Sequence, residues 1–328
     1  MTLTVIAPGL ETSIQDWPGR RGFINQGFPI SGPFDSWSFR LANRLVGNEP
    51  GTAALECQFL GPTLRFDVDT VIAVTGAEMS PKLDGAPIET WTSVAVRAGQ
   101  TLALGPARSG ARTYIAVAGG IDNPAMLGSR STFHKAGVGG IGGKALTAHQ
   151  SVPIDRPTSL PPAGRRVDPS RRPPIAGDGR WVVEVVLGPN DDWISPKGHE
   201  RFFGTEWKLS AKSDRTGMRL EGPDWLFAPR AIDKPPENGK APSNIIDQGY
   251  PLGAINLAGS TPIILPVDGP SMGGFINPYT VITAALWKLG QARPGNFLRF
   301  VALDVEAAQE KARELAKLCG PEAIDLAT

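Results

Sequence analysis

The sequence has few of the side chains on which metal and disulfide chemistry depend. Its 328 residues include only two cysteines, Cys57 and Cys319, and three histidines. No two of these residues have the spacing of a zinc site and no CxxC occurs, so neither a zinc site nor a disulfide framework is expected. We therefore predict no metal site, and the low cysteine content indicates a reducing compartment.

Long hydrophobic runs and an excess of one charge sign are also lacking. No apolar run approaches the ~20 residues that cross a bilayer, and the N-terminus has no signal-peptide pattern. The net charge is +1, with charges of both signs dispersed along the chain. Such a chain has no electrostatic footprint for nucleic acid or an anionic membrane. The sequence predicts a soluble, cytoplasmic protein that binds neither.

Two common catalytic patterns are missing as well. There is no G-x-S-x-G turn of the kind that presents a serine nucleophile. The glycine-rich run 137–143 is not followed by a helix, so it does not predict a dinucleotide site. Acyl-serine and nicotinamide chemistry are therefore not expected.

Glycine and proline, by contrast, are abundant, with 39 and 31 residues. They predict many short strands joined by tight turns. The strands are expected at residues 54–59, 63–68, 70–75, 94–96, 101–104, 112–118, 181–187, 206–210, 254–257 and 262–267. A helix is expected at 36–46 and another at 304–318, and Asp84-Gly85 predicts a two-residue hairpin turn.

The stretch 268–279, DGPSMGGFINPY, organises the second half of the chain. An apolar strand precedes it, and its glycines and prolines predict a rigid backbone. We expect a helix at 279–289, with Asn277 as its N-cap and Pro278 as its first residue. Such a turn is suited to holding a small polar molecule.

Short stretches of similar sequence in the two halves of the chain predict an internal repeat. Gly-Pro, a short spacer and a helix are expected at residue 32 and again at residue 269. A repeat of this length indicates two related domains. We place them at 1–152 and 181–303, with a Pro/Arg-rich linker at 153–180 and a C-terminal helix and tail at 304–328.

Neutral polar and charged residues on glycine-shaped loops remain as candidate site residues. Groups of this kind bind a polar ligand and stabilise developing charge without supplying a nucleophile. Asp35 has a second interpretation as a helix N-cap, Arg130 as a brace for loop carbonyls and Tyr250 as a packed ring. The candidates are Ser31, Asp35, Arg40, Asn43, Ser129, Arg130, Asn244, Asp247, Tyr250, Asp268 and Ser271, with Gly273 and Gly274.

Several motifs resemble one known family. They are GFPISGPFDSWSFRLANRLVGN at 27–48, LGSRSTF at 127–133 and RTGMRLEGP at 215–223. Together they are similar to the biotin-dependent carboxyltransferases, which include allophanate hydrolase subunit 2 and the C subunit of 5-oxoprolinase. DGPSMGGF at 268–275 and LWKLGQARPG at 286–295 most resemble the carboxyltransferase domain of urea carboxylase. Asn277 departs from that pattern, where urea carboxylases often have Cys.

The resemblance implies a mainly β fold with two cyclophilin-like β-barrel domains related by the repeat, and a few short helices. It implies carboxyl transfer from carboxybiotin to the nitrogen of urea or a urea-like amide. We expect Asp268 to accept N–H bonds from the substrate, since a carboxylate only accepts and urea offers several donors. Asn43, Ser31 and Arg40 are expected on the opposite wall, with Tyr250 and Asn244 nearby. Asp268, Asn43 and Tyr250 are the predicted catalytic residues, and the other candidates except Asp35 are predicted to bind substrate or biotin.

The chain has no Ala-Met-Lys-Met biotinylation site and no ATP-binding glycine loop. The resemblance therefore implies separate partners: a second carboxyltransferase subunit like allophanate hydrolase subunit 1, a biotin carboxylase and a biotin carrier. Biotin would arrive on the carrier, and ATP would be used only by a partner. Two alternatives stay open, the C subunit of an ATP-dependent 5-oxoprolinase and a non-enzymatic regulatory subunit.

Overall fold

The computed structural model describes residues 1–325, which are mainly β with a few helices. This confirms the predicted fold class. Two compact units share the chain. The first comprises residues 1–21, 30–175 and the chain from 315, and the second comprises 22–29 and 176–314.

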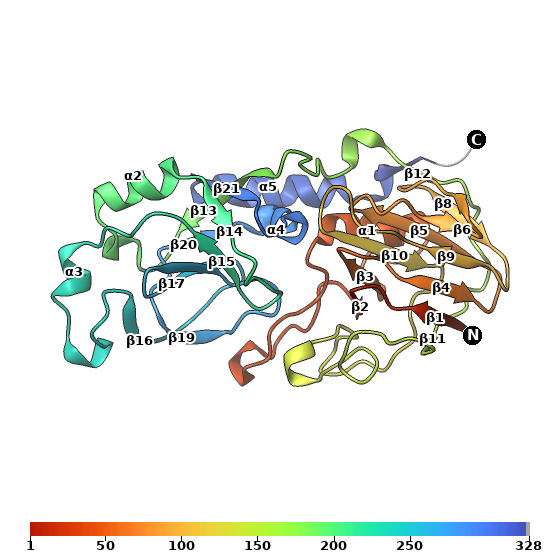
Figure 1. The fold of residues 1–328 in the computed structure, drawn as a ribbon, viewed down its shortest axis with the longest axis horizontal. Coiled ribbons are helices and arrows are strands. Elements are labelled where there is room, and N and C mark those ends of the chain that lie inside the picture. Colours follow the sequence, from red (N-terminus) through yellow and green to blue (C-terminus); the bar gives the residue numbers. More distant parts are fainter. Residues whose placement is uncertain (326–328) are drawn as a thin grey trace. The chain divides into compact units, whose positions relative to one another are not determined.

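The first unit contains two antiparallel sheets (Figure 1). The six-stranded sheet has the order β11 (Ser151–Pro153), β1 (Thr2–Ala7), β4 (Thr63–Phe66), β9 (Thr101–Ala103), β6 (Lys82–Leu83) and β7 (Ala86–Pro87). The five-stranded sheet has the order β2 (Glu11–Gln15), β3 (Ala54–Gln58), β10 (Arg112–Val117), β5 (Thr70–Gly76) and β8 (Ser93–Val96).

One hydrophobic core lies between these sheets. Leu3 and Val5 of β1 and Leu55 and Cys57 of β3 are at most 1% exposed and belong to the same buried cluster. Residues two apart on a strand point to the same face, so the inner faces of both sheets supply this core. The predicted hairpin turn is confirmed, with Asp84 at φ 48° between β6 and β7.

Helix α1 (Ser36–Leu45) covers strands β5 and β10 of the five-stranded sheet (Figure 1). Asp35 is its N-cap, because its Oδ1 accepts hydrogen bonds at 3.0 Å from the backbone N–H groups of Trp37 and Ser38. Phe39 meets Tyr114 of β10 edge to face, with ring centroids 5.8 Å apart. Of the two interpretations of Asp35, the structure gives the cap.

The second unit is built on a closed seven-stranded barrel. Its strands are β13 (Arg180–Leu187), β20 (Tyr279–Val281), β17 (Ala254–Ala258), β18 (Thr261–Ile264), β15 (Met218–Glu221), β14 (Trp207–Leu209) and β21 (Phe297–Ala302). Among these described strands, only β13 and β21 pair in parallel. Aromatic rings stabilise the interior, where Phe202 stacks on Tyr279 and Phe300 with centroids 4.0 and 4.8 Å apart. The closed barrel predicted for this half of the chain is thus present, whereas the first half forms the two facing sheets.

The helix predicted at 279–289 is wrong in its first half. Tyr279–Val281 is strand β20, and helix α4 extends only over Leu286–Gln291 after a 3-10 turn at Thr283–Ala285. Tyr279 and Val281 are buried and pair with β13 and β17, so tertiary pairing overrides the helical pattern. Asn277 caps no helix, and its amide instead donates to the Tyr279 carbonyl at 3.2 Å.

A two-stranded ribbon, β16 (Asn244–Gly249) with β19 (Met272–Phe275), completes the sheet structure of the second unit. The remaining helices are α2 (Pro196–Gly204), α3 (Pro229–Ile232) and α5 (Val305–Leu318). Short 3-10 turns occupy Ile24–Gln26, His134–Ala136, Pro169–Arg171, Asp191–Trp193, Pro236–Asn238 and Pro321–Ala323. No helix within residues 1–325 combines the length and the apolar character that crossing a membrane requires.

Much of the segment expected to be a linker is part of the first unit. Strand β12 (Arg166–Val167) pairs with β22 (Ile324–Asp325), and the Trp37 indole donates to the Arg171 carbonyl at 2.9 Å. Arg172 donates two hydrogen bonds to the Val167 carbonyl. The Arg172 side chain thus binds a backbone carbonyl, a role that the sequence pattern of this segment does not reveal.

Both cysteines are fully buried free thiols. Burial raises the pKa of Cys57 to about 12 and that of Cys319 to about 12. At pH 8 only about one thiol in 10⁴ is then a thiolate, the form that reacts. We expect neither cysteine to react with a colourimetric thiol reagent in the folded protein, whereas both react in denaturant. Rapid labelling of the folded chain would contradict this burial.

Candidate functional site

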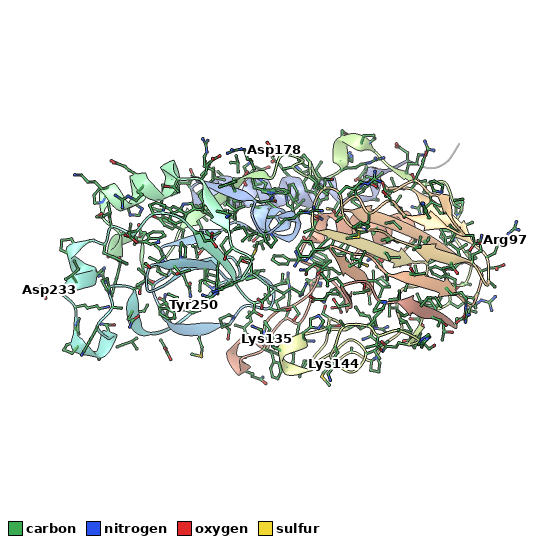
Figure 2. The ribbon with its side chains drawn as sticks, viewed as in Figure 1. Arg97, Lys135, Lys144, Asp178, Asp233 and Tyr250 are labelled. Carbon is green, nitrogen blue, oxygen red and sulfur yellow. The ribbon has the colours of Figure 1, made fainter. Side chains whose placement is uncertain are left out.

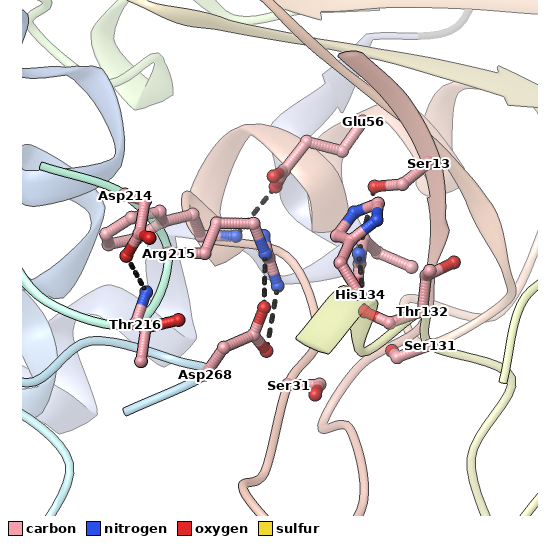
Figure 3. Close-up of polar contacts among 12 residues, drawn as sticks. Ser13, Ser31, Glu56, Ser131, Thr132, His134, Asp214, Arg215, Thr216 and Asp268 are labelled. Atoms are coloured by element: carbon pink, nitrogen blue, oxygen red, sulfur yellow. Dashed lines mark hydrogen bonds and ion pairs between the residues drawn. The ribbon is translucent and has the colours of Figure 1, made fainter. Parts of the chain in front are cut away.

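An ion pair between Asp268 and Arg215 lies on the loops of the barrel (Figure 3). Asp268 lies between β18 and β19, and Arg215 lies in the turn before β15. Arg215 Nε donates to Asp268 Oδ2 at 2.8 Å, and Nη2 donates to Oδ1 at 3.4 Å. The backbones of the two residues are bonded as well, since the Asp268 N–H donates to the Arg215 carbonyl at 2.9 Å. The two residues are 4% and 5% exposed, so the carboxylate is fixed in one orientation.

The turn that carries Arg215 is itself held by a carboxylate. Asp214 Oδ1 accepts hydrogen bonds from the N–H groups of Thr216 and Gly217 at 2.7 and 3.0 Å (Figure 3). This is the local bonding that favours aspartate in turns. Arg215 was not among the predicted site residues, although the RTGMRLEGP motif contains it.

Tyr250, labelled in Figure 2, directly follows β16 and belongs to a buried cluster with Ala254 of β17 and Leu265. Its hydroxyl accepts from the Phe275 N–H at 2.7 Å and donates to the Phe275 carbonyl at 2.9 Å. Burial raises the pKa of the Tyr250 phenol, so this group stays a neutral hydrogen-bonding partner. The structure thus supports the interpretation of Tyr250 as a packed ring with a bonded hydroxyl.

The two glycines of the ribbon allow this close packing. A Cβ on Gly273 would lie 3.0 Å from Tyr250 Cε2, and a Cβ on Gly274 would lie 3.0 Å from the Ile245 carbonyl oxygen. Larger side chains would push the strands apart, so glycine keeps the backbone near the tyrosine.

The ribbon and the loop before it bring together seven residues predicted from the sequence. Asp247 is exposed, whereas Asn244 and Ser271 are half-buried. The Ser271 carbonyl accepts from Tyr250 N–H at 2.8 Å, which ties the loop to the ribbon. The seven residues are Asn244, Asp247, Tyr250, Asp268, Ser271, Gly273 and Gly274.

In the first unit, Asp16 anchors the loop that carries Ser129 and Arg130. Its carboxylate accepts from the hydroxyls of Ser129 and Ser131 at 2.5 Å each, and from the Arg130 N–H at 2.8 Å. Asp16 was not among the predicted site residues, although Asp-Trp-Pro-Gly at 16–19 is a sequence that favours a turn. Ser129 and Ser131 are both fully buried, and their hydroxyls bind the Asp16 carboxylate.

Arg20 is fully buried and joins this loop to Ser31. It donates to the Ser131 carbonyl at 2.8 Å, to the Met126 carbonyl at 3.3 Å and to Ser31 Oγ at 3.3 Å. Sequence reasoning missed Arg20, because nothing in its neighbourhood distinguishes it from a surface arginine. Arg130 has the bracing role left open above, since its guanidinium donates to the Ile121 carbonyl at 2.7 Å.

Arg40 and Asn43 differ in what they offer to a ligand. The Arg40 guanidinium lies 4.5 Å from the centroid of the Trp17 ring, and its buried Nε has no hydrogen-bond partner within the described chain. Asn43 is fully buried, donates to the Thr52 carbonyl at 2.8 Å and accepts from Asn48 at 3.0 Å. The Asn43 amide is thus bonded to the loop after α1, and its catalytic role stays a prediction.

A second buried network holds the Ser31–Asp35 loop. Glu56 accepts from the Tyr114 hydroxyl and from the Phe34 N–H at 2.8 Å each, and lies 3.4 Å from the Arg112 guanidinium. The Tyr114 hydroxyl also accepts from the Asp35 N–H at 2.7 Å. Burial raises the pKa of Tyr114 well above its usual range, so this phenol remains a donor.

Two hollows of the structure lie away from these residues. One of about 640 Å³ is in the first unit, and one of about 660 Å³, lined by Trp225, Phe227 and Ile232, is in the second. Neither is lined by a predicted site residue. In the part of the chain that the structure describes, no group of three His, Cys, Asp or Glu residues is placed to hold a metal ion.

The barrel and its loops therefore define a mainly β protein that presents fixed hydrogen-bonding groups. Residues 26–302 match the family described as Carboxyltransferase domain, subdomain A and B. The chain belongs to this family.

Relatives fall into two groups. The chain is 41% identical over 312 residues to urea amidolyase of Saccharomyces cerevisiae, a match that covers 94% of this chain and 17% of that protein. It is 31% identical over 319 residues to the C subunit of 5-oxoprolinase from Escherichia coli, a match that covers 95% of this chain and 94% of that protein. The crystal structure of urea amidolyase from K. lactis superposes with a TM-score of 0.91 at 38% identity, over 99% of this chain and 20% of that one. The family resemblance expected from the motifs is confirmed.

Proposed function

We propose that this protein is the carboxyltransferase component of a biotin-dependent carboxylase that carboxylates the nitrogen of urea or a urea-like amide. The observation that carries the proposal is its 41% identity to urea amidolyase over 94% of its length. Its identity to the 5-oxoprolinase relative is lower, at 31%. The chain spans only 17% of the urea amidolyase that it matches, so the remaining steps belong elsewhere.

The barrel loops would hold the amide. Asp268 accepts N–H groups of the substrate, because each carboxylate oxygen keeps a lone pair beyond its bond to Arg215. Arg215 is a positioning residue that fixes the plane of this carboxylate. Asn244 and Asp247 of the ribbon and Ser271 of the loop before β19 supply further polar contacts, and Gly273 and Gly274 let the backbone approach the ligand.

The first unit offers donors suited to an oxygen ligand. Arg40 has a buried Nε with no partner within residues 1–325, which a ureido or carboxylate oxygen would satisfy. This donor fits biotin, which, when bound, supplies the carboxyl group. Arg20 would hold the loops that contain Ser31, Ser129 and Arg130, and these three stay predicted binding residues.

The chain alone should not complete the reaction, since it lacks a biotinylation motif and an ATP-binding glycine loop. We expect no fixation of labelled bicarbonate into urea by the purified chain with ATP. Activity is expected once a biotin carboxylase, a biotinylated carrier and the second carboxyltransferase half are added, on other chains or as other parts of a longer one. Fixation of labelled bicarbonate by the isolated chain would contradict the predicted requirement for partners.

The reconstituted mixture also separates the two groups of relatives. Urea-dependent formation of a labelled, carboxylated product supports the proposal. Glutamate release from 5-oxoproline with ATP, and no urea-dependent labelling, would replace it with the 5-oxoprolinase assignment. That alternative is favoured by the fact that the chain covers 94% of its 5-oxoprolinase relative.

A further inference from the structure

The cavity of about 640 Å³ in the first unit lies where both sheets end. The β6–β7 hairpin forms one edge of the six-stranded sheet, and β8 forms one edge of the five-stranded sheet. The loop carrying Ser129 is tied to the opposite edge, since the Thr132 N–H donates to the Ile14 carbonyl of β2 at 2.9 Å. The cavity is thus separate from the first-unit residues used above.

A third wall is fixed by backbone hydrogen bonds. The Ser93 N–H donates to the Arg165 carbonyl at 2.8 Å, and the Val167 N–H donates to the Trp91 carbonyl at 3.0 Å. This wall places Arg166 and Arg172 in the cavity lining. Arg172 is held by Nε and Nη2, which donate to the Val167 carbonyl at 3.2 and 2.8 Å. Its Nη1 makes no such bond within the described chain.

The charges of the lining are unequal. Three cations, Lys82, Arg166 and Arg172, face two carboxylates, Glu78 and Glu89. Glu89 pairs with Arg166 at 3.0 Å, and Glu78 accepts from the Ser80 N–H at 2.9 Å.

Two of these cations are left without a carboxylate in contact. The Lys82 side chain makes no hydrogen bond or ion pair within residues 1–325, and no carboxylate there lies within ion-pair distance of Arg172. Burial lowers the pKa of Arg172, and the charge of Arg166 adds to this effect, while Asp168 and Glu89 oppose it. An anion beside Arg172 would stabilise the charged form of Arg172 against the effects of burial and of repulsion from Arg166.

We propose that this cavity binds a small-molecule anion through a carboxylate or phosphate group held by Arg172 and Lys82. The volume suits a small organic ligand. Pro81, Pro87 and Ile88 line the same space and would contact the apolar part of that ligand. This site is independent of the function proposed above.

Isothermal titration at constant ionic strength tests the proposal, with inorganic phosphate and malonate as probes. We expect saturable binding of at least one probe at one site per chain, and the probe that binds identifies the head group. Arg172→Gln should weaken binding about tenfold, the loss of about 1.4 kcal/mol expected for one charge-assisted contact. Arg97→Gln is the matched control, because Arg97 projects from the surface outside the cavity lining (Figure 2).

Lys82→Ala is a second test of the site in case the Arg172 variant does not fold. The Lys82 side chain makes no polar contact that the fold requires. The substitution should weaken binding by about threefold, a loss of about 0.65 kcal/mol, with an unchanged thermal unfolding curve. Absence of saturable binding for both probes would overturn the proposal. Unchanged affinity in the Lys82 and Arg172 variants, or an equal loss in the Arg97 variant, would overturn it too.

Discussion

Asp268→Asn is expected to lower urea-dependent carboxyl transfer by at least about 10²-fold in the reconstituted system, the scale seen when one fixed polar contact to a reacting group is removed. The amide has one acceptor oxygen in place of two. It therefore cannot serve both the Arg215 fork and the substrate N–H groups. Initial rates with labelled carboxybiotinyl carrier protein measure the effect.

The same change weakens a buried ion pair, so stability must be followed in parallel. We expect a loss of about 1.5–3 kcal/mol, the range for a hydrogen bond to a charged group. Asp233→Asn is the matched control, because Asp233 is exposed and makes no side-chain hydrogen bond or ion pair in the described chain. Arg215→Lys keeps the charge but loses the fork, so it should reduce the rate less than Asp268→Asn. Full turnover by a folded Asp268→Asn enzyme would refute the assigned role.

Glu56→Ala is expected to destabilise the first unit by about 3–5 kcal/mol, because it removes a buried carboxylate that pairs with the buried Arg112. Glu56 is 3% exposed and Arg112 is 4% exposed. The substitution also removes the acceptor for the Tyr114 hydroxyl and the Phe34 N–H. Chemical denaturation followed by tryptophan fluorescence gives the free energy of unfolding.

Two further variants test whether the loss of stability in Glu56→Ala comes from the buried network. Glu49→Ala removes an exposed glutamate without side-chain hydrogen bonds in residues 1–325, and should change stability by less than about 0.5 kcal/mol. Glu56→Gln keeps an acceptor oxygen and should recover part of the loss. If Glu56→Ala unfolds at the wild-type denaturant concentration, the network contributes nothing to the fold.

Sequence reasoning succeeded where the pattern is local. The strands over 54–58 and 63–66 follow alternating apolar residues, the strand over 70–76 follows a continuous apolar run, and helix α1 follows its cap and apolar face. It failed at Tyr279–Val281, where long-range pairing with β13 and β17 decides the structure. No local signal distinguishes a strand that closes a barrel from the first turn of a helix.

The candidate site shows the same division. The glycine-rich stretch at 268–279 identified Asp268 as a candidate, but its ion-pair partner Arg215 lies 53 residues away and is placed by tertiary contacts. The two hydrogen bonds of the Asn43 amide, to Thr52 and Asn48, are likewise placed by the fold and not revealed by the motif that contains Asn43. Residue type predicts what a side chain can bond, whereas burial decides what it does bond.

The interleaving of the two units has a practical consequence for dissection. The chain leaves the first unit after residue 21, returns at 30, leaves again at 175 and comes back at 315. A protease cut or stop codon near residue 176 would therefore not release an intact N-terminal half. Such a fragment lacks β22, which pairs with β12, and the Cys319 carbonyl, to which Arg44 Nε donates at 2.7 Å. Excising the first unit whole would require rejoining three stretches of polypeptide, so each unit depends on the chain being made through to its last helix.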